Sequence, residues 1–246
     1  MSGLGERALY DRMLANLVGC WTRIATGTKG ASVVKIAGGV IAVFPEGPER
    51  AFYNNAVLAR DLDGPSIAEA VTAVLRAYQE AGVGGYAIWA HESEGATIAE
   101  LEGRGLGVDT TTRAMAMSLE DISVPRPDLD LAPSDWDEYL RIVEVPEGTL
   151  AGVDPRDFHV LVGRLDGESV TAGMAYDHDG DCGIYNVGTL AHTRRRGLGT
   201  ALTGLHLHLA RERGCTTASL QSTEDAEGIY AAVGFRSLGR FIEYAR

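Results

Sequence analysis

The stretch Tyr185-Asn-Val-Gly-Thr-Leu-Ala-His-Thr-Arg-Arg-Arg-Gly-Leu-Gly-Thr-Ala-Leu202 decides the fold of the segment around it. An apolar run gives way to three arginines, a Gly-x-Gly and residues at helical spacing, which predicts a strand, a tight turn and a helix. The first N–H groups of a helix have no partner within it, and beside Arg194, Arg195 and Arg196 they attract an anion as large as a pyrophosphate. Glycine pairs also occur in turns that bind nothing, so this stretch alone leaves both interpretations open.

The composition predicts a globular chain that is acidic outside this stretch. With 246 residues, 45% of them hydrophobic, the chain can bury one large core or two cores of about 120 residues each. A net charge of −12 argues against a general nucleic-acid binder. Cys20, Cys182 and Cys215 follow no metal-ligand spacing, which favours a reducing cytoplasm and no metal. Charges interrupt the first apolar segment and no run approaches ~18 apolar residues, so we expect a cytoplasmic protein without a membrane partner.

The hydrophobic periodicity predicts nearly the same order of elements twice. In the first half we expect a helix over residues 5–24, strands over 32–36, 40–44 and 52–58, a helix with Ser66 as N-cap, a strand over 86–90, a helix around 97–101 and a strand over 112–119. In the second half we expect a helix over 134–142, strands over 158–165, 169–177 and 182–190, a helix up to about 213, a strand over 217–221, a helix over 226–232 and a strand over 235–244. The proline-containing segment 121–131 predicts a linker, which divides the chain into domains 1–125 and 126–246.

Short sequence matches suggest that the halves are copies of one α+β fold with a mixed sheet. Tyr53-Asn54 corresponds to Tyr185-Asn186, and Leu101-x-x-x-Gly-Leu106 corresponds to Tyr230-x-x-x-Gly-Phe235. Where the second half has its arginines and glycines, the first half has Asp61-Leu-Asp-Gly-Pro65, which adds carboxylates and a proline without an N–H. We therefore predict one anion site, in the second half.

With both motifs in view, residues 128–246 resemble the GCN5-related N-acetyltransferase (GNAT) family. The family's signature Arg/Gln-x-x-Gly-x-Gly/Ala, which opens a helix after the fourth strand, fits Arg194–Gly199, and its later Tyr-x-x-x-Gly-Phe fits Tyr230–Phe235. The resemblance implies two GNAT-like acyl-CoA N-acyltransferase domains in tandem. The first domain would be a degenerate copy without a cofactor site, and the second would bind acetyl-CoA as co-substrate.

The resemblance also implies which residues bind acetyl-CoA. The backbone of Val187, Gly188 and Thr189 would bind the pantetheine arm and the acetyl carbonyl, where the fourth strand splays from the fifth. The pyrophosphate would lie on the loop and helix start formed by Arg194, Arg195, Arg196, Gly197, Leu198, Gly199 and Thr200. Thr223 stands where many members have an asparagine that contacts CoA. Tyr230 stands where many members have the general acid that reprotonates the CoA thiolate, although an aromatic core residue is the alternative interpretation.

The general base is not identified by the resemblance. Ala191 stands where many members have a proline, and no glutamate occupies the fourth strand, where the base is often found. The candidates are Asp177, Asp181, His159 and His192, acting directly or through water. Solvation of a hairpin turn explains the two aspartates, and surface exposure explains His192, without a catalytic role.

We therefore expect an N-acetyltransferase in which a primary amine of a small molecule or peptide attacks the thioester directly. The alternative is a non-catalytic acyl-CoA-binding sensor or partner-binding protein, which the missing glutamate favours and Tyr230 opposes. A Walker-type enzyme lacks support, because no Gly-Lys-Ser/Thr follows the glycines. In the first half, Trp89, His91 and Glu92 could reach the acceptor cleft, although packing and solvation explain them equally well. The sequence leaves open the acceptor and whether the chain forms a homodimer.

Overall fold

The structure is a computed structural model that describes residues 4–47, 53–133 and 135–246. The chain forms two compact units, and neither is continuous in sequence. Unit 1 comprises the residues up to Cys20 together with Ala114–Leu238, and unit 2 comprises Trp21–Arg113 together with Gly239–Arg246. Helix α1 (Glu6–Thr26) and strands β5 (Gly107–Ser118) and β10 (Arg236–Ala245) each have residues in both units. The predicted domain division after residue 125 stays a prediction.

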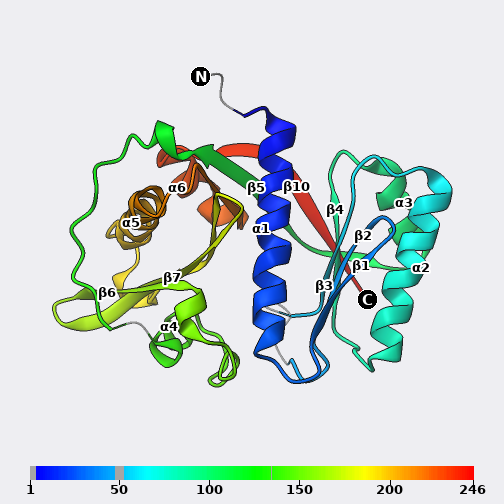
Figure 1. Cartoon of the computed structure of the whole chain (residues 1–246), viewed down its shortest axis with the longest axis horizontal. Coiled ribbons are helices and arrows are strands. Elements are labelled where there is room, and N and C mark those ends of the chain that lie inside the picture. The colour runs from blue at the N-terminus through cyan, green and yellow to red at the C-terminus, as the bar shows by residue number, and fades with distance from the viewer. Residues whose placement is uncertain (1–3, 48–52, 134) are drawn as a thin grey trace. The chain divides into compact units, whose positions relative to one another are not determined.

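Unit 2 contains most of the first set of elements. Its strands follow the order β1 (Ser32–Ile36), β2 (Gly39–Val43), β3 (Asn55–Leu58), β4 (Ala87–His91) and β10. The β1–β2, β2–β3 and β4–β10 pairs are antiparallel, whereas β3 and β4 are parallel. Helix α2 (Gly64–Glu80) connects β3 to β4, and α3 (Gly95–Gly103) connects β4 to β5 (Figure 1). The buried face of α2 joins the apolar core of this unit, where Tyr78 stacks on Tyr86 at 4.3 Å between ring centroids.

Unit 1 contains most of the second set of elements. Its strands follow the order β5, β9 (Thr217–Ser222), β8 (Asp181–Thr189), β7 (Glu168–His178) and β6 (His159–Leu165). The β6–β7 and β7–β8 pairs are antiparallel, and β8 pairs with β9 in parallel. The helices are α4 (Trp136–Ile142), α5 (Leu198–Glu212) and α6 (Glu227–Ala232), and α5 packs against β7 and β8 (Figure 1). The hairpin turns at Asp166-Gly167 and Asp179-Gly180 have positive φ at both residues, so these predicted turns are confirmed.

The predicted α+β fold with a mixed sheet is confirmed, and so is the repeated order of a helix, three strands, and then helix, strand, helix and strand. Three predicted details are wrong. Strand β3 begins at Asn55, so Tyr53 and Asn54 do not belong to the strand. Helix α2 begins after Asp63, whose carboxylate accepts a hydrogen bond from the Ser66 backbone N–H at 2.9 Å, so Asp63 is the N-cap and Ser66 lies inside the helix. Strand β5 begins at Gly107 rather than at residue 112. Phe52 and Ser134, the first residues of a predicted strand and helix, lie outside the described residues.

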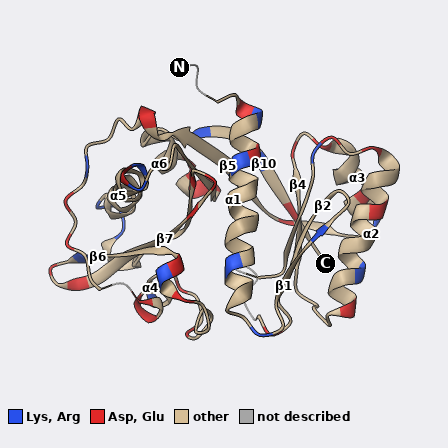
Figure 2. Ribbon diagram, in the orientation of Figure 1, with Lys and Arg blue, Asp and Glu red and all other residues tan. Residues whose placement is uncertain are grey.

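Residues of both charges lie along α1 and α2 (Figure 2). Among the described residues, every helix is too short or too polar to cross a membrane. The described part of the chain also contains no group of three or more His, Cys, Asp and Glu residues that could hold a metal ion. The three cysteines are buried as free thiols.

Candidate functional site

Strands β8 and β9 diverge in the middle of β8. Their parallel pairing joins Asp181–Gly183 to Thr217–Ser219 and ends there. On the other side of β8 the register with β7 shifts between Tyr185 and Gly188, where Asn186 has a left-handed φ of 48°. This bulge re-aims the strand at the point where it leaves β9. The structure thus has the splay between these strands that the resemblance implies.

A cavity of about 260 Å³ opens where the strands diverge. Its walls come from the end of α4, the second half of β8, the end of β9 and helix α6. The lining residues are Ile142, Val143, Glu144, Asn186, Val187, Gly188, Thr189, Arg194, Gln221, Ser222, Thr223, Ala226 and Tyr230. Six residues that the sequence assigned to the site therefore surround one cavity: Val187, Gly188, Thr189, Arg194, Thr223 and Tyr230.

The end of α4 packs directly on β8 at Gly188. A methyl group added to Gly188 would lie 3.1 Å from the Ile142 carbonyl oxygen and 3.2 Å from Val143 Cα, so a larger residue would require the end of α4 to shift by a few tenths of an ångström. Thr171 on β7 fixes the strand from the other side. Its hydroxyl donates to the Gly188 carbonyl at 2.8 Å and lies 2.9 Å from the Thr189 hydroxyl. The backbone beside the cavity is therefore held on both sides.

The start of α5 offers the open helix N-terminus that the sequence predicts. Gly197 occupies the N-cap position with φ of 78°, and no side chain caps the N–H groups that follow. Arg195 also has a positive φ, of 62°, and the three arginines are exposed. Arg194 donates from Nε to the Thr189 carbonyl at 2.9 Å, which ties the loop to the end of β8. The geometry suits a phosphate-bearing ligand at a positive helix end.

Tyr230 lies on α6, with part of its ring against the apolar core and part facing the cavity. Its ring packs edge-on against Phe235 at 6.0 Å between centroids, which explains the spacing of the Tyr-x-x-x-Gly-Phe motif. Burial raises the pKa of Tyr230 to about 12. The phenol is therefore protonated at neutral pH, as a proton donor must be.

None of the four predicted bases lines the cavity. Burial would raise the pKa of Asp177, but hydrogen bonds and charge from Arg213 and His159 outweigh it and hold this pKa well below the usual range. Burial raises the pKa of Asp181, which accepts hydrogen bonds of 2.6 Å from each of the hydroxyls of Thr217 and Ser219. These groups lie at the end of β8 away from the splay.

His192, the fourth predicted base, is exposed and lies 3.4 Å from the Glu168 carboxylate. Four polar residues that line the cavity were not predicted from the sequence, namely Glu144, Asn186, Gln221 and Ser222. Glu144 follows a helix with no motif around it, so nothing in its neighbourhood could have identified it. Asn186 was noted only as part of a repeat, although asparagine tolerates the left-handed conformation it has here.

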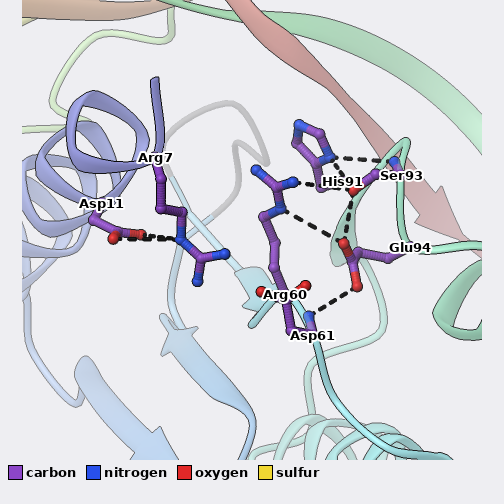
Figure 3. A network of polar contacts seen from close by, with 7 residues as sticks. All are labelled: Arg7, Asp11, Arg60, Asp61, His91, Ser93 and Glu94. Atoms are coloured by element: carbon purple, nitrogen blue, oxygen red, sulfur yellow. Dashed lines mark hydrogen bonds and ion pairs between the residues drawn. The ribbon is translucent and has the colours of Figure 1, made fainter. Parts of the chain in front are cut away.

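The corresponding helix start in unit 2 is filled by the chain's own acidic groups. Asp63 caps α2, and Pro65 in the first turn has no N–H to donate. Figure 3 shows Glu94 accepting a hydrogen bond of 2.9 Å from the Asp61 backbone N–H and one of 2.7 Å from the Ser93 hydroxyl. Arg60 lies 3.5 Å from the same carboxylate. An added phosphate would meet carboxylates in place of free donors.

The left-handed asparagine of β8 has a counterpart in unit 2. Asn54, which the sequence aligns with Asn186, also has a left-handed φ, of 55°. Its side chain accepts from the Phe44 N–H at 2.8 Å and donates to the Phe44 carbonyl at 3.2 Å. Asn54 is thus buried and hydrogen-bonded to Phe44, whereas Asn186 lines the cavity.

Residues 118–235 match the model of the acetyltransferase (GNAT) family. No curated protein matches the sequence. A solved structure described as a GCN5-related N-acetyltransferase from Kribbella flavida is 21% identical, with a TM-score of 0.72 over 99% of this chain and 96% of that one.

Two further solved structures are similar over nearly the whole chain. A GCN5-related N-acetyltransferase from Sphaerobacter thermophilus is 15% identical, with a TM-score of 0.57 over 96% of this chain and 90% of that one. A tandem GNAT protein from the clavulanic acid biosynthesis pathway is 12% identical, with a TM-score of 0.59 over 98% of this chain and 96% of that one. The chain therefore has the fold of the GCN5-related N-acetyltransferases over nearly its full length, and its residues 118–235 match that family.

Proposed function

We propose that the protein transfers an acetyl group from acetyl-CoA to a primary amine. The observation that carries this proposal is that a protonated Tyr230 lines the same cavity as Val187, Gly188 and Thr189. A thioester held along that backbone would have a proton donor within the same cavity, next to an open helix N-terminus. The match of residues 118–235 to the GNAT family supports the same reaction.

Acetyl-CoA would bind with its two ends on different elements. The pyrophosphate would lie on the N–H groups of Arg195 through Thr200, with Arg194–Arg196 adding positive charge. The pantetheine arm would run along β8 where β9 has left it, toward Thr223 and Tyr230. The first turn of α5 lies close to this strand, since a methyl group on Gly199 would be 3.7 Å from the Thr189 hydroxyl oxygen.

The amine would attack the acetyl carbon directly. A backbone N–H of β8 would stabilise the oxyanion of the tetrahedral intermediate. When the intermediate collapses, the C–S bond breaks and the thiolate takes the proton of the Tyr230 hydroxyl. No metal and no covalent enzyme intermediate is required for these steps.

We also propose that the first half is a second, degenerate GNAT-like copy that serves as a scaffold. The repeated element order and the left-handed φ of both Asn54 and Asn186 support this history. Trp89 and His91 are buried within unit 2, and their contribution to an acceptor cleft, like that of Glu92, stays a prediction. The capped start of α2 supports a single cofactor site per chain.

Replacing Tyr230 tests this proposal. Tyr230→Phe removes the hydroxyl and keeps the packing on Phe235, so we expect acetyl transfer to fall about 10²-fold while acetyl-CoA still binds one molecule per chain. The measurements are free-thiol release and calorimetric titration. Tyr176→Phe, at a half-buried tyrosine on β7 outside the cavity, is the matched control. Unchanged turnover in Tyr230→Phe would remove Tyr230 from the mechanism.

A further inference from the structure

Glu144 lines the candidate acetyl-transfer cavity, and no sequence motif pointed to it. Of the described residues that line the cavity, Glu144 is the one carboxylate. It is exposed at the cavity wall, and no residue in the described part of the chain forms a hydrogen bond or ion pair with its side chain. By contrast, the four carboxylates and imidazoles considered from the sequence all lie elsewhere.

The backbone at Glu144 has a conformation that glycine normally supplies. Helix α4 ends at Ile142, and Glu144 follows with φ of 59°. The Val145 N–H donates to the Leu140 carbonyl at 3.0 Å, which is the long hydrogen bond of a Schellman helix end. A left-handed residue with a Cβ costs about 1 kcal/mol relative to glycine. Strained positions of this kind cluster at functional sites.

Helix α4 is fixed in position, so the backbone of Glu144, which follows its end, is fixed too. The Asp135 carboxylate caps the helix by accepting from the Glu138 N–H at 2.8 Å. The Trp136 indole donates to the Val153 carbonyl at 2.7 Å, and Arg141 donates to the Ser169 carbonyl at 2.9 Å. The end of the helix then packs on Gly188, in the part of β8 proposed to hold the acetyl carbonyl.

We propose that Glu144 binds the ammonium group of the acceptor and takes its first proton. This inference rests on the proposed acetyl transfer. The carboxylate is an anion in a cavity that otherwise offers the cation Arg194 and neutral groups, so it would attract a protonated primary amine. A neutral amine is the species that can attack the thioester.

The protons balance over the reaction. The ammonium nitrogen gives one proton to Glu144, which passes it to solvent, and the freed lone pair forms the C–N bond. The nitrogen loses its second proton as the intermediate collapses and the C–S bond breaks. The departing thiolate is protonated by Tyr230, whose hydroxyl is restored by that second proton through water. One proton is released for each acetyl group transferred.

The test compares Glu144→Gln with wild-type protein in acetyl transfer to a panel of primary amines that includes diamines, amino sugars and lysine peptides. We expect kcat/KM for the amine to fall about 10²-fold near pH 7, with acetyl-CoA affinity unchanged. The difference in kcat/KM between wild type and Glu144→Gln should decrease as pH rises toward 9.5, because the variant depends on amine that is already neutral in solution. Glu147→Gln, three residues along the same loop and outside this cavity, should keep wild-type kinetics.

A second variant separates a binding role from a folding role. Glu144→Gly should unfold at higher denaturant concentration than wild type, as Asp166→Gly should at the positive-φ hairpin turn, yet lose transfer as Glu144→Gln does. If wild type releases thiol in the presence of an amine and Glu144→Gln has the same kcat/KM, the proposed role of Glu144 is overturned and the proposed acetyl transfer is not. Acetyl-CoA binding without amine-dependent thiol release in wild type would overturn the proposed function and this inference together.

Discussion

His206 is a histidine in the interior of unit 1, where burial disfavours its charged form. It lies on the inner face of α5, fully buried, next to Gly173 of β7. No hydrogen bond of good geometry reaches either ring nitrogen from the described residues. Burial, reinforced by the charge of Arg213, lowers the pKa of His206 to about 3, although the Gly173 backbone opposes the shift.

This depressed pKa makes the stability of the protein depend on pH. As pH falls, the unfolded chain binds a proton at His206 near pH 6.5, whereas the folded chain does not. The free energy of unfolding is therefore undiminished by His206 above pH 6.5 and decreases as pH falls from there toward 3. Between pH 8 and pH 5 the loss from this residue should be about 2 kcal/mol. His206→Leu should remove that loss and leave the protein at least as stable at pH 8. Urea unfolding of both proteins at pH 8 and pH 5 measures this loss of unfolding free energy. An equal loss in wild type and in His206→Leu would contradict a neutral buried His206.

The residues proposed for catalysis were only partly predictable from sequence. Tyr230 was predicted because its spacing to Phe235 forms a motif, and in the structure that spacing places the two rings in contact. Asp177 and Asp181 were considered because they are acids near β8. Their sequence does not show that Arg213 and two hydroxyls already engage them.

At the scale of elements, the starts of α2 and α5 show why one helix could hold an anion and the other could not. The α5 start is uncapped behind Gly197, whereas the α2 start is closed by Asp63 and Pro65. The sequence predicted this difference from charge and glycine content, because both act locally. It misplaced the α2 cap at Ser66, since Asp and Ser are both favoured N-caps and stand three residues apart.

The contact between α4 and β8 could not be predicted, because it joins residues more than forty positions apart along the chain. Gly188 is where it can be tested. We expect Gly188→Ala to push the Ile142 carbonyl and Val143 away from the strand, to lower the free energy of unfolding by about 1–3 kcal/mol and to reduce acetyl transfer at least about tenfold.

Gly95→Ala in α3 is the matched control, because nothing lies within 4 Å of the added methyl group and its φ is not positive. Its stability should stay within about 0.5 kcal/mol of wild type. Thermal unfolding and thiol release measure both variants. A Gly188→Ala protein with wild-type stability and turnover would show that the close approach of α4 to β8 is not needed.

At the scale of the whole molecule, element order was the most predictable property. Hydrophobic periodicity and turn residues act over a few positions, and they were enough to predict the repeated order of helices and strands. The residues that make up each compact unit could not be predicted in the same way. The C-terminal residues 239–246 belong to unit 2 while most of the second half belongs to unit 1, and such long-range pairing has no local signal.

The central claim, that this chain is an acetyltransferase, is tested most directly by following acetyl-CoA and an amine panel together. Free CoA thiol and acetylated amine should appear in equal amounts, and only when both substrates are present. We expect such amine-dependent release for at least one amine, with a fall of about 10²-fold in Tyr230→Phe. Tight acetyl-CoA binding with no amine-dependent thiol release across the panel would contradict it and would identify an acyl-CoA-binding sensor.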